Sequence, residues 1–215
     1  HGGGWAGRDP RYFYPFAKHF ADRGMVGISV QYRLFNPGQG ITVFDCVKDA
    51  RSAMRYVRTH ANDLGIDPTR IVATGGSAGA HLAVGTALFT GIDEADEDRS
   101  VSCLPNLLIL YYPVIDTSEN GYGRAKIGER WRELSPVDHV RPGLPPTLIL
   151  HGTADTVTPF AGALRFQALM QKACNTCELI AFKGGAHGYF LRDLEWFNEA
   201  MAQTEAFLRN NGMQD

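Results

Sequence analysis

The sequence predicts an α/β protein built on a doubly wound, mostly parallel β-sheet. Short apolar runs of strand length alternate along the chain with amphipathic stretches of helical length, separated by connections that carry Gly and Pro. This alternation is typical of a parallel sheet whose two faces are covered by helices. With 215 residues, no internal repeat and no linker-like stretch, residues 1–215 are expected to form a single domain.

The first half of the chain is expected to contribute three helices and two strands. Phe13, Phe16 and Phe20 recur at helical spacing in the first helix, and Val47 and Met54 lie on the apolar stripe of the second. The first strand is apolar enough to be buried on both faces, as parallel strands are. The expected elements are a helix at 11–23, a strand at 25–32, a helix at 43–62, a strand at 70–73 and a helix at 82–89.

The second half continues the same alternation. After an acidic loop at 91–100, which is expected to be a solvated surface, the pattern predicts strands and helices in turn. An irregular stretch at about 116–144, with a helix-like piece at 129–134, interrupts the alternation as a short cap-like insertion. The expected elements are strands at 106–114, 147–150 and 178–182, and helices at 160–172 and 195–210.

The charge balance limits the classes of partner. The chain carries 21 Lys and Arg against 23 Asp and Glu, a formal net charge of −2. This balance predicts neither a nucleic-acid partner nor attraction to a membrane surface. In addition, no apolar run approaches the ~18 residues that a membrane-spanning helix requires.

The cysteines predict no metal site. Of Cys46, Cys103, Cys174 and Cys177, only the last two lie close together in the sequence. A zinc site would need a second such pair or nearby His ligands. The spacing of Cys174 and Cys177 leaves two alternatives open, ordinary free thiols or a local disulfide.

The segment GGSAG at 75–79 has the pattern of a nucleophile elbow. It follows a short apolar run and precedes a helix-like run, and Ser77 stands at the centre of the turn. Glycines two residues before and two after Ser77 allow a sharp bend, because a Cβ at Gly75 or Gly79 would collide where strand and helix crowd together. The pattern therefore predicts a serine hydroxyl that stands clear of the backbone.

Three candidate catalytic groups fall at the carboxyl ends of predicted strands. These are Ser77, Asp155 and His187, and the carboxyl ends of parallel strands are where open α/β sheets bind ligands. A serine hydroxyl needs a base within hydrogen-bond reach, and that base needs a third group to fix its tautomer. Two alternatives concern the acid: Asp116 follows another strand, and Asp155 could instead form an Asx turn before Pro159.

Four short motifs resemble the α/β-hydrolase superfamily, and most closely its hormone-sensitive-lipase-like and acetyl-esterase group. They occur in the order expected for that group and span the chain: HGGGW at 1–5, GGSAGAHL at 75–82, HGTAD at 151–155 and GGAHG at 184–188. The resemblance implies Ser77 as nucleophile, His187 as general base and then acid, and Asp155 as the group that orients it. The four motifs thus imply a complete serine-hydrolase triad.

The same resemblance implies that the backbone N–H groups of Gly3, Gly4 and Ala78 receive the oxyanion. Ala78 lies at the predicted start of a helix, where backbone donors and the helix dipole favour negative charge. Trp5 and His81 are candidates for the walls of the substrate pocket, although His81 and also His151 have an equally simple interpretation as structural histidines.

The implied activity is that of a serine carboxylester hydrolase that works through an acyl-enzyme and needs no cofactor or metal. The resemblance favours small-molecule esters of short acyl groups such as acetyl, with carbohydrate esters among the candidates. A feruloyl-type esterase and an arylformamidase share the motifs. A serine peptidase of this fold is less favoured because Ala78, not an aromatic residue, follows Ser77. A non-catalytic binding protein is less favoured because all three triad residues are present.

The resemblance also predicts a strand that the sequence does not contain. In the superfamily, a strand before the glycine loop lies between the strands that correspond here to 25–32 and 70–73, whereas this chain opens directly on HGGGW. Each buried backbone group left unpaired costs about 1–3 kcal/mol. The natural protein is therefore expected to extend upstream, so that 1–215 is an N-terminally incomplete domain.

Overall fold

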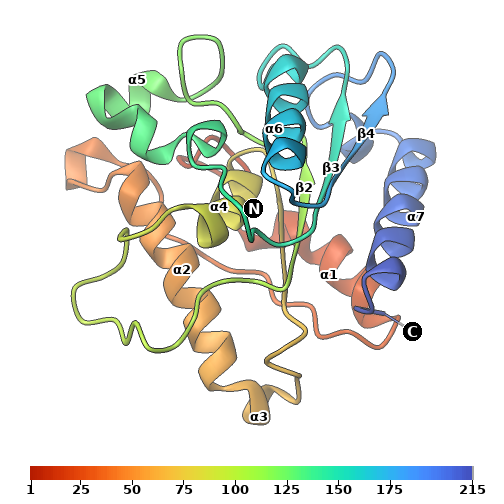
Figure 1. Ribbon diagram of the computed structural model, residues 1–215, viewed down its shortest axis with the longest axis horizontal. Coiled ribbons are helices and arrows are strands. Elements are labelled where there is room, and N and C mark those ends of the chain that lie inside the picture. The colour runs from red at the N-terminus through yellow and green to blue at the C-terminus, as the bar shows by residue number, and fades with distance from the viewer. Residues whose placement is uncertain (215) are drawn as a thin grey trace.

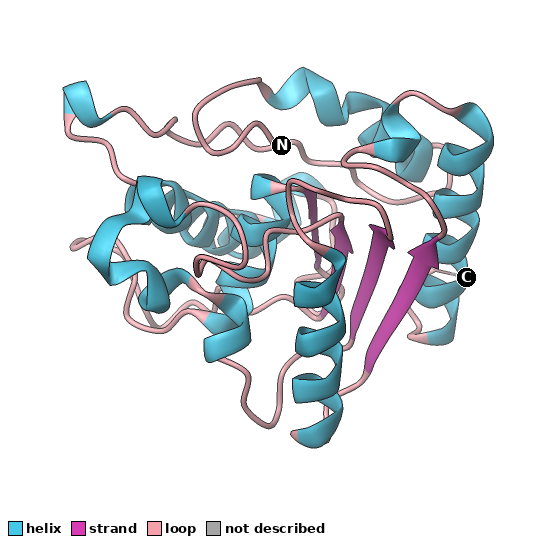
Figure 2. Cartoon of the chain, turned by 90° about the horizontal axis from the view of Figure 1, so that it is seen from above, coloured by secondary structure: helices cyan, strands magenta, loops and turns pink. Residues whose placement is uncertain are grey.

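Four parallel strands form the sheet of the computed structural model, which describes residues 1–214 (Figure 1). The strands lie in the order β1-β2-β3-β4, and in register Thr74 pairs with Ile109 while Ile109 pairs with Leu148. Because all four strands run the same way, their carboxyl ends share one edge of the sheet (Figure 2). The strands are β1 (Val72–Gly76), β2 (Leu107–Tyr111), β3 (Thr147–Gly152) and β4 (Cys177–Phe182).

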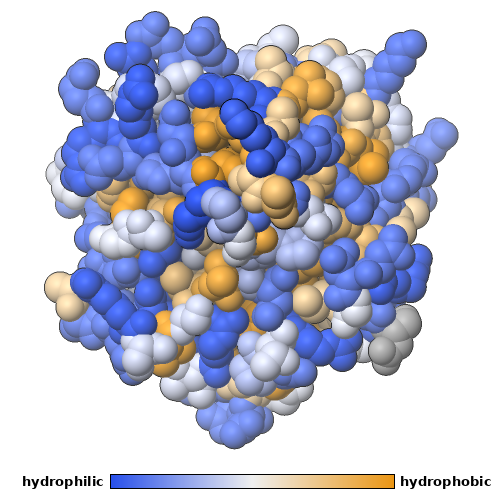
Figure 3. Space-filling view, viewed as in Figure 1, coloured by the Kyte–Doolittle hydropathy of each residue, from blue (hydrophilic) through white to orange (hydrophobic). Residues whose placement is uncertain are grey.

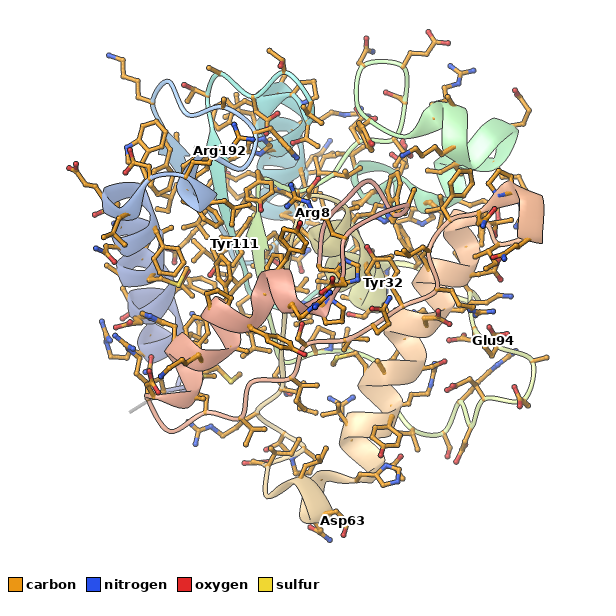
Figure 4. All side chains as sticks on the ribbon, turned by 180° about the vertical axis from the view of Figure 1, so that it is seen from behind. Arg8, Tyr32, Asp63, Glu94, Tyr111 and Arg192 are labelled. Carbon is orange, nitrogen blue, oxygen red and sulfur yellow. The ribbon has the colours of Figure 1, made fainter. Side chains whose placement is uncertain are left out.

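Helices cover both faces of this sheet, which confirms the predicted fold class. The helices α2, α4 and α6 lie on one face, and α1 and α7 lie on the other, which is turned to the viewer in Figure 4. The expected helix at 43–62 is divided at His60 into two helices. The α-helices are α1 (Tyr14–Ala21), α2 (Val43–Thr59), α3 (Ala61–Leu64), α4 (Ala78–Leu88), α5 (Arg124–Ile127), α6 (Phe160–Lys172) and α7 (Leu194–Asn210). Short 3-10 helices are η1 (Pro10–Phe13), η2 (Pro37–Gln39), η3 (Gly128–Leu134), η4 (Pro136–Asp138) and η5 (Tyr189–Leu191).

The central strand β2 shows why two helical layers are needed. Its side chains are buried on both faces, with Leu108 and Leu110 in the cluster formed with α2, α4 and α6. Leu107, Ile109 and Tyr111 point the other way, into the cluster formed with α1 and α7. A strand that is apolar at every position requires cover on both sides, so the sequence of β2 explains the three-layer arrangement.

Residues 25–32 do not form the strand expected from their composition. Within residues 1–214, the backbone of this segment makes a single backbone–backbone hydrogen bond, donated by the Met25 N–H to the Phe20 carbonyl. A cavity of about 510 Å³ separates the segment from β1 and is lined by residues of both. An extended segment becomes a β-strand only when a neighbour pairs with it, and no segment within residues 1–214 pairs with this one.

The acidic loop at 91–100 is not solvated throughout, contrary to expectation. The Asp93 side chain is only 4% exposed and forms ion pairs with Arg51 and Arg55 of α2, each at 2.8 Å. Arg55 also pairs with Glu97 at 3.4 Å. A buried carboxylate needs charged partners, so these arginines hold the acidic loop against the helix.

All four cysteines are free, which decides between the alternatives left open for Cys174 and Cys177. Cys174 is exposed, whereas Cys177 begins β4 and is buried. Burial raises the pKa of the Cys177 thiol to about 12. That thiol is therefore protonated at neutral pH and unreactive.

The surface seen in Figure 3 is mostly hydrophilic, with apolar residues gathered around α6. Leu164, on this helix, is about half exposed. Within residues 1–214, no helix is both long enough and apolar enough to cross a membrane.

Candidate active site

Ser77 occupies a strained turn between β1 and α4. Its φ of 57° and ψ of −122° lie where a non-glycine residue is costly, and such outliers gather at functional sites. A Cβ on Gly75 would lie 2.4 Å from the carbonyl carbon of Gly79, as the elbow pattern predicts. A Cβ on Gly79 would instead lie 2.7 Å from the backbone of His1, so this glycine makes room for the glycine loop at 1–5.

A continuous chain of hydrogen bonds joins Ser77, His187 and Asp155. The Nε2 atom of His187 lies 2.9 Å from the Ser77 Oγ, and its Nδ1 atom lies 2.8 Å from Oδ2 of Asp155. A carboxylate accepts the Nδ1 proton, which leaves Nε2 free to accept the serine proton. The structure thus brings together the three residues that the sequence analysis selected, although they come from three different strand ends.

The Asp155 carboxylate is held by several donors. Its Oδ1 accepts from the N–H groups of Val157 and Thr158, at 2.8 and 2.9 Å, which is the Asx-turn geometry considered above. Its Oδ2 accepts from His187 and from the Thr158 hydroxyl at 2.9 Å, and lies 3.3 Å from Nε2 of His151. The two interpretations of Asp155 are therefore compatible, because one oxygen forms the turn and the other holds the histidine.

Burial alone would raise the pKa of Asp155, since it disfavours the charged form. The hydrogen bonds from His151 and His187, together with those from Thr158, outweigh burial and hold the pKa well below its usual range. Asp155 is therefore ionised across the neutral and mildly acidic range, as an orienting carboxylate requires.

The rival acid, Asp116, makes no hydrogen bond to His187 in the part of the chain that the structure describes. Its carboxylate accepts from the Ser118 N–H at 2.8 Å and pairs with Arg165 at 3.4 Å. The geometry therefore favours Asp155 over Asp116.

The glycine loop lies against Ser77, as the oxyanion assignment requires. A Cβ on Gly2 would be 2.8 Å from the Gly76 carbonyl oxygen and 3.3 Å from the Ser77 Cβ. The N–H groups of Gly3 and Gly4, and that of Ala78 at the start of α4, donate to no acceptor within residues 1–214. Unpaired backbone donors next to a serine nucleophile are suited to a developing oxyanion.

Trp5 and His81, the two candidates for pocket walls, are buried, and for His81 this agrees with its interpretation as a structural histidine. Both side chains have no solvent exposure, and their rings meet edge to face with centroids 5.0 Å apart. The Trp5 ring also packs against Tyr122, and His81 Nε2 lies 2.8 Å from the Leu134 carbonyl. Both rings are buried because residues of the insertion at 116–144, among them Tyr122 and Leu134, cover them.

The burial of His81 is expected to make the protein less stable at acidic pH. Burial lowers its pKa from 6.5 to about 4, so between these values the unfolded chain binds a proton that the folded chain does not. Stability is therefore expected to fall by about 3 kcal/mol as the pH drops from 6.5 to 4. Urea unfolding of the wild type and of His81→Asn across this range measures the effect. Parallel pH curves for the two proteins would contradict this assignment.

Sequence reasoning missed Tyr112, which shapes the site. Its ring meets the His187 ring edge to face at 4.9 Å, and a Cβ on Gly76 would lie 2.6 Å from its hydroxyl oxygen. Its φ of 36° is a further backbone outlier at this edge of the sheet. The position of Tyr112 directly after β2 was the available signal, because β1 and β3 flank that strand.

No group of three His, Cys, Asp or Glu side chains within residues 1–214 is arranged to hold a metal ion.

Comparisons with known proteins show which family this chain resembles in sequence and fold. The BD-FAE family model matches residues 1–170. The apo form of Thermogutta terrifontis esterase 2 superimposes with a TM-score of 0.92 and 41% identity, covering 100% of this chain and 82% of that one. The same esterase has also been solved with propionate bound, with butyrate bound, and phosphorylated by paraoxon.

Two curated relatives are more distant. A probable isoprenylcysteine alpha-carbonyl methylesterase of Arabidopsis thaliana is 27% identical over 89% of this chain and 45% of its own length. The probable carboxylic ester hydrolase LipM of Mycobacterium tuberculosis is 28% identical over 77% of this chain and 42% of its own. The chain thus spans about half the length of the curated relatives it matches. Taken with the family match and the solved esterase, these findings show that the chain belongs to the BD-FAE family, among the esterases of the α/β-hydrolase superfamily.

Proposed function

We propose that the chain carries the catalytic site of a serine carboxylester hydrolase that acts on short-chain esters through an acyl-enzyme. The observation that carries this proposal is the unbroken set of hydrogen bonds from Ser77 Oγ through His187 to Asp155. The unpaired donors of the glycine loop beside Ser77 support it further. The names of the solved esterase and of the two curated relatives described above, a methylesterase and a carboxylic ester hydrolase, point the same way.

In the first half of the reaction, Ser77 attacks the ester carbonyl while His187 Nε2 takes the hydroxyl proton. The negative charge that develops on the carbonyl oxygen is received by the N–H groups of Gly3, Gly4 and Ala78. The tetrahedral intermediate collapses when His187 returns the proton to the departing alcohol. The acid part of the substrate remains bonded to Ser77.

In the second half, His187 removes a proton from water, which attacks the same carbonyl carbon. The second tetrahedral intermediate uses the same backbone donors, and its collapse releases the acid and restores Ser77. Asp155 stabilises the imidazolium in both halves, and its low pKa keeps it charged throughout. No step of this scheme draws on a cofactor.

Two features support a short acyl group. The solved esterase that is 40% identical to this chain has been obtained with propionate and with butyrate bound. In addition, Trp5 and His81 are fully buried and leave no room for a deep acyl channel where they lie. An acetyl group on a carbohydrate remains a prediction for the natural substrate.

A series of p-nitrophenyl esters from acetate to decanoate tests this proposal. We expect kcat/KM to be greatest from acetate to butyrate and to fall about tenfold or more by octanoate, because a small pocket rejects added methylenes. Acetylated xylan, compared with p-nitrophenyl acetate, tests the carbohydrate assignment. A maximum at decanoate would overturn the short-chain proposal, and no hydrolysis of any ester would overturn the esterase itself.

A further inference from the structure

The carbonyl groups of the glycine loop at 1–5 accept hydrogen bonds that fix their orientation. The Gly2 carbonyl lies 3.0 Å from Nδ1 of His1. The neighbouring His1 carbonyl accepts a hydrogen bond of 2.8 Å from the hydroxyl of Tyr32, which is labelled in Figure 4. The Gly3 carbonyl accepts from the Ala6 N–H at 3.1 Å. In a trans peptide the C=O and N–H point in opposite directions, so a fixed carbonyl also fixes the N–H on the other side of the same plane.

The next carbonyl, that of Gly4, is held by a side chain far away in the sequence. It accepts a hydrogen bond of 2.8 Å from the ammonium of Lys126, which lies on α5 in the insertion. The ammonium lies 3.4 Å from the Tyr122 hydroxyl, and within residues 1–214 it has no carboxylate within 4.0 Å. The charge of Lys126 is therefore directed mainly at this one carbonyl.

The peptide between Gly4 and Trp5 is strained in the orientation that Lys126 holds. Both residues have left-handed backbone angles, with φ of 60° at Gly4 and 62° at Trp5. Glycine adopts this region freely, but for a bulky residue such as Trp5 it costs about 1–2 kcal/mol. Rotating the peptide plane by about half a turn would bring φ of Trp5 to a negative value and relieve this strain.

The surroundings of Trp5 would allow that rotation without moving the ring. The Trp5 carbonyl, on the following plane, accepts from the Phe35 N–H at 2.8 Å, and the buried indole is fixed between His81 and Tyr122. Within residues 1–214, Lys126 makes the only hydrogen bond to the Gly4–Trp5 peptide plane. If this plane rotated, the Gly4 carbonyl and the Trp5 N–H would change places. The group that lies next to the proposed oxyanion donors would then be different.

We propose that Lys126 is a positioning residue for the oxyanion loop: it holds the Gly4 carbonyl and so keeps the Gly4–Trp5 peptide in its strained, catalytically competent orientation. This inference rests on the proposed esterase function. It also gives the insertion at 116–144 a role beyond that of a cap, because Lys126 bonds the loop and Tyr122 and Gly123 pack against Trp5.

The test compares Lys126→Met with Lys126→Arg and with a matched control, Lys48→Met. Lys48 lines the same cavity of about 390 Å³ as Lys126 but pairs with Asp45 and Glu94 instead of the glycine loop. For Lys126→Met we expect kcat on p-nitrophenyl acetate to fall about tenfold or more, the value of a hydrogen bond to a charged group, with KM and Tm nearly unchanged. Lys126→Arg, which keeps a cationic donor, should recover most of the turnover, and Lys48→Met should keep all of it.

A crystal structure of Lys126→Met tests the role of Lys126 independently of the proposed function, because the structure can be determined whether or not the protein hydrolyses esters. We expect φ of Trp5 to become negative, with the peptide rotated. An unchanged peptide, or a kcat equal to that of the wild type in an active enzyme, would overturn the role of Lys126 and leave the esterase proposal intact. A loss of Tm with a matching rise in KM would show a merely structural role and would likewise overturn it.

Discussion

Ser77→Ala is expected to lower kcat for p-nitrophenyl acetate by about a millionfold, the size of effect found when a triad serine is removed. The variant keeps the backbone donors of the loop but has no atom to form the acyl-enzyme. Its fold should be unaffected, because alanine has the same Cβ and the elbow angles belong to the backbone. Steady-state kinetics on purified protein, with circular dichroism to check folding, measures the loss.

The matched control for this change is Ser118→Ala, on the insertion, which should retain wild-type kcat. Among the residues that the structure describes, the Ser118 hydroxyl accepts only from the Asn120 N–H and does not contact the triad. Substantial turnover by Ser77→Ala would contradict the nucleophile assignment. Equal losses in both variants would point to a general effect on folding.

Asp155→Asn is expected to lower kcat about ten-thousandfold through the wrong histidine tautomer. The structure dictates how the new amide would lie. Two backbone N–H groups, those of Val157 and Thr158, require an acceptor at the Oδ1 position, so the amide oxygen must stay there. The NH₂ group is then directed at His187, which must accept at Nδ1 and carry its proton on Nε2, where it cannot take the serine proton.

Asp116→Asn makes the same chemical change at the rival acid and should leave kcat within about threefold of the wild type, because its partners are Ser118 and Arg165. Kinetics of both variants on one substrate decides the matter. A large loss in Asp116→Asn with a small one in Asp155→Asn would show that the acid has been misassigned.

Elements whose signal is local could be predicted from the sequence. The helix at 160–172 is found with the expected bounds as α6, and β2 lies within the apolar run at 106–114. The segment at 25–32 could not be predicted in the same way. Its composition favours a strand, but a strand depends on a neighbour supplied from elsewhere in the chain, and composition carries no information about that neighbour.

The same distinction holds at the site. Ser77, Asp155 and His187 could be predicted from the sequence because each lies in a short motif whose turn geometry is encoded by the adjacent glycines. The burial of Trp5, the ion pairs of Asp93 and the contact of Lys126 with Gly4 depend on packing between distant segments. A lysine on a short helix has no sequence signature that distinguishes it from an ordinary solvated lysine.

The most direct test of the account is covalent labelling of the nucleophile. After incubation with paraoxon, which phosphorylates the related Thermogutta terrifontis esterase 2, intact-mass and peptide mass spectrometry should find one diethylphosphoryl group per chain, on Ser77, with ester hydrolysis lost in proportion to labelling. Ser77→Ala should take up none. A protein that hydrolyses esters while its label lies on another residue, or while Ser77 remains unlabelled, would contradict the central claim that Ser77 is the catalytic nucleophile.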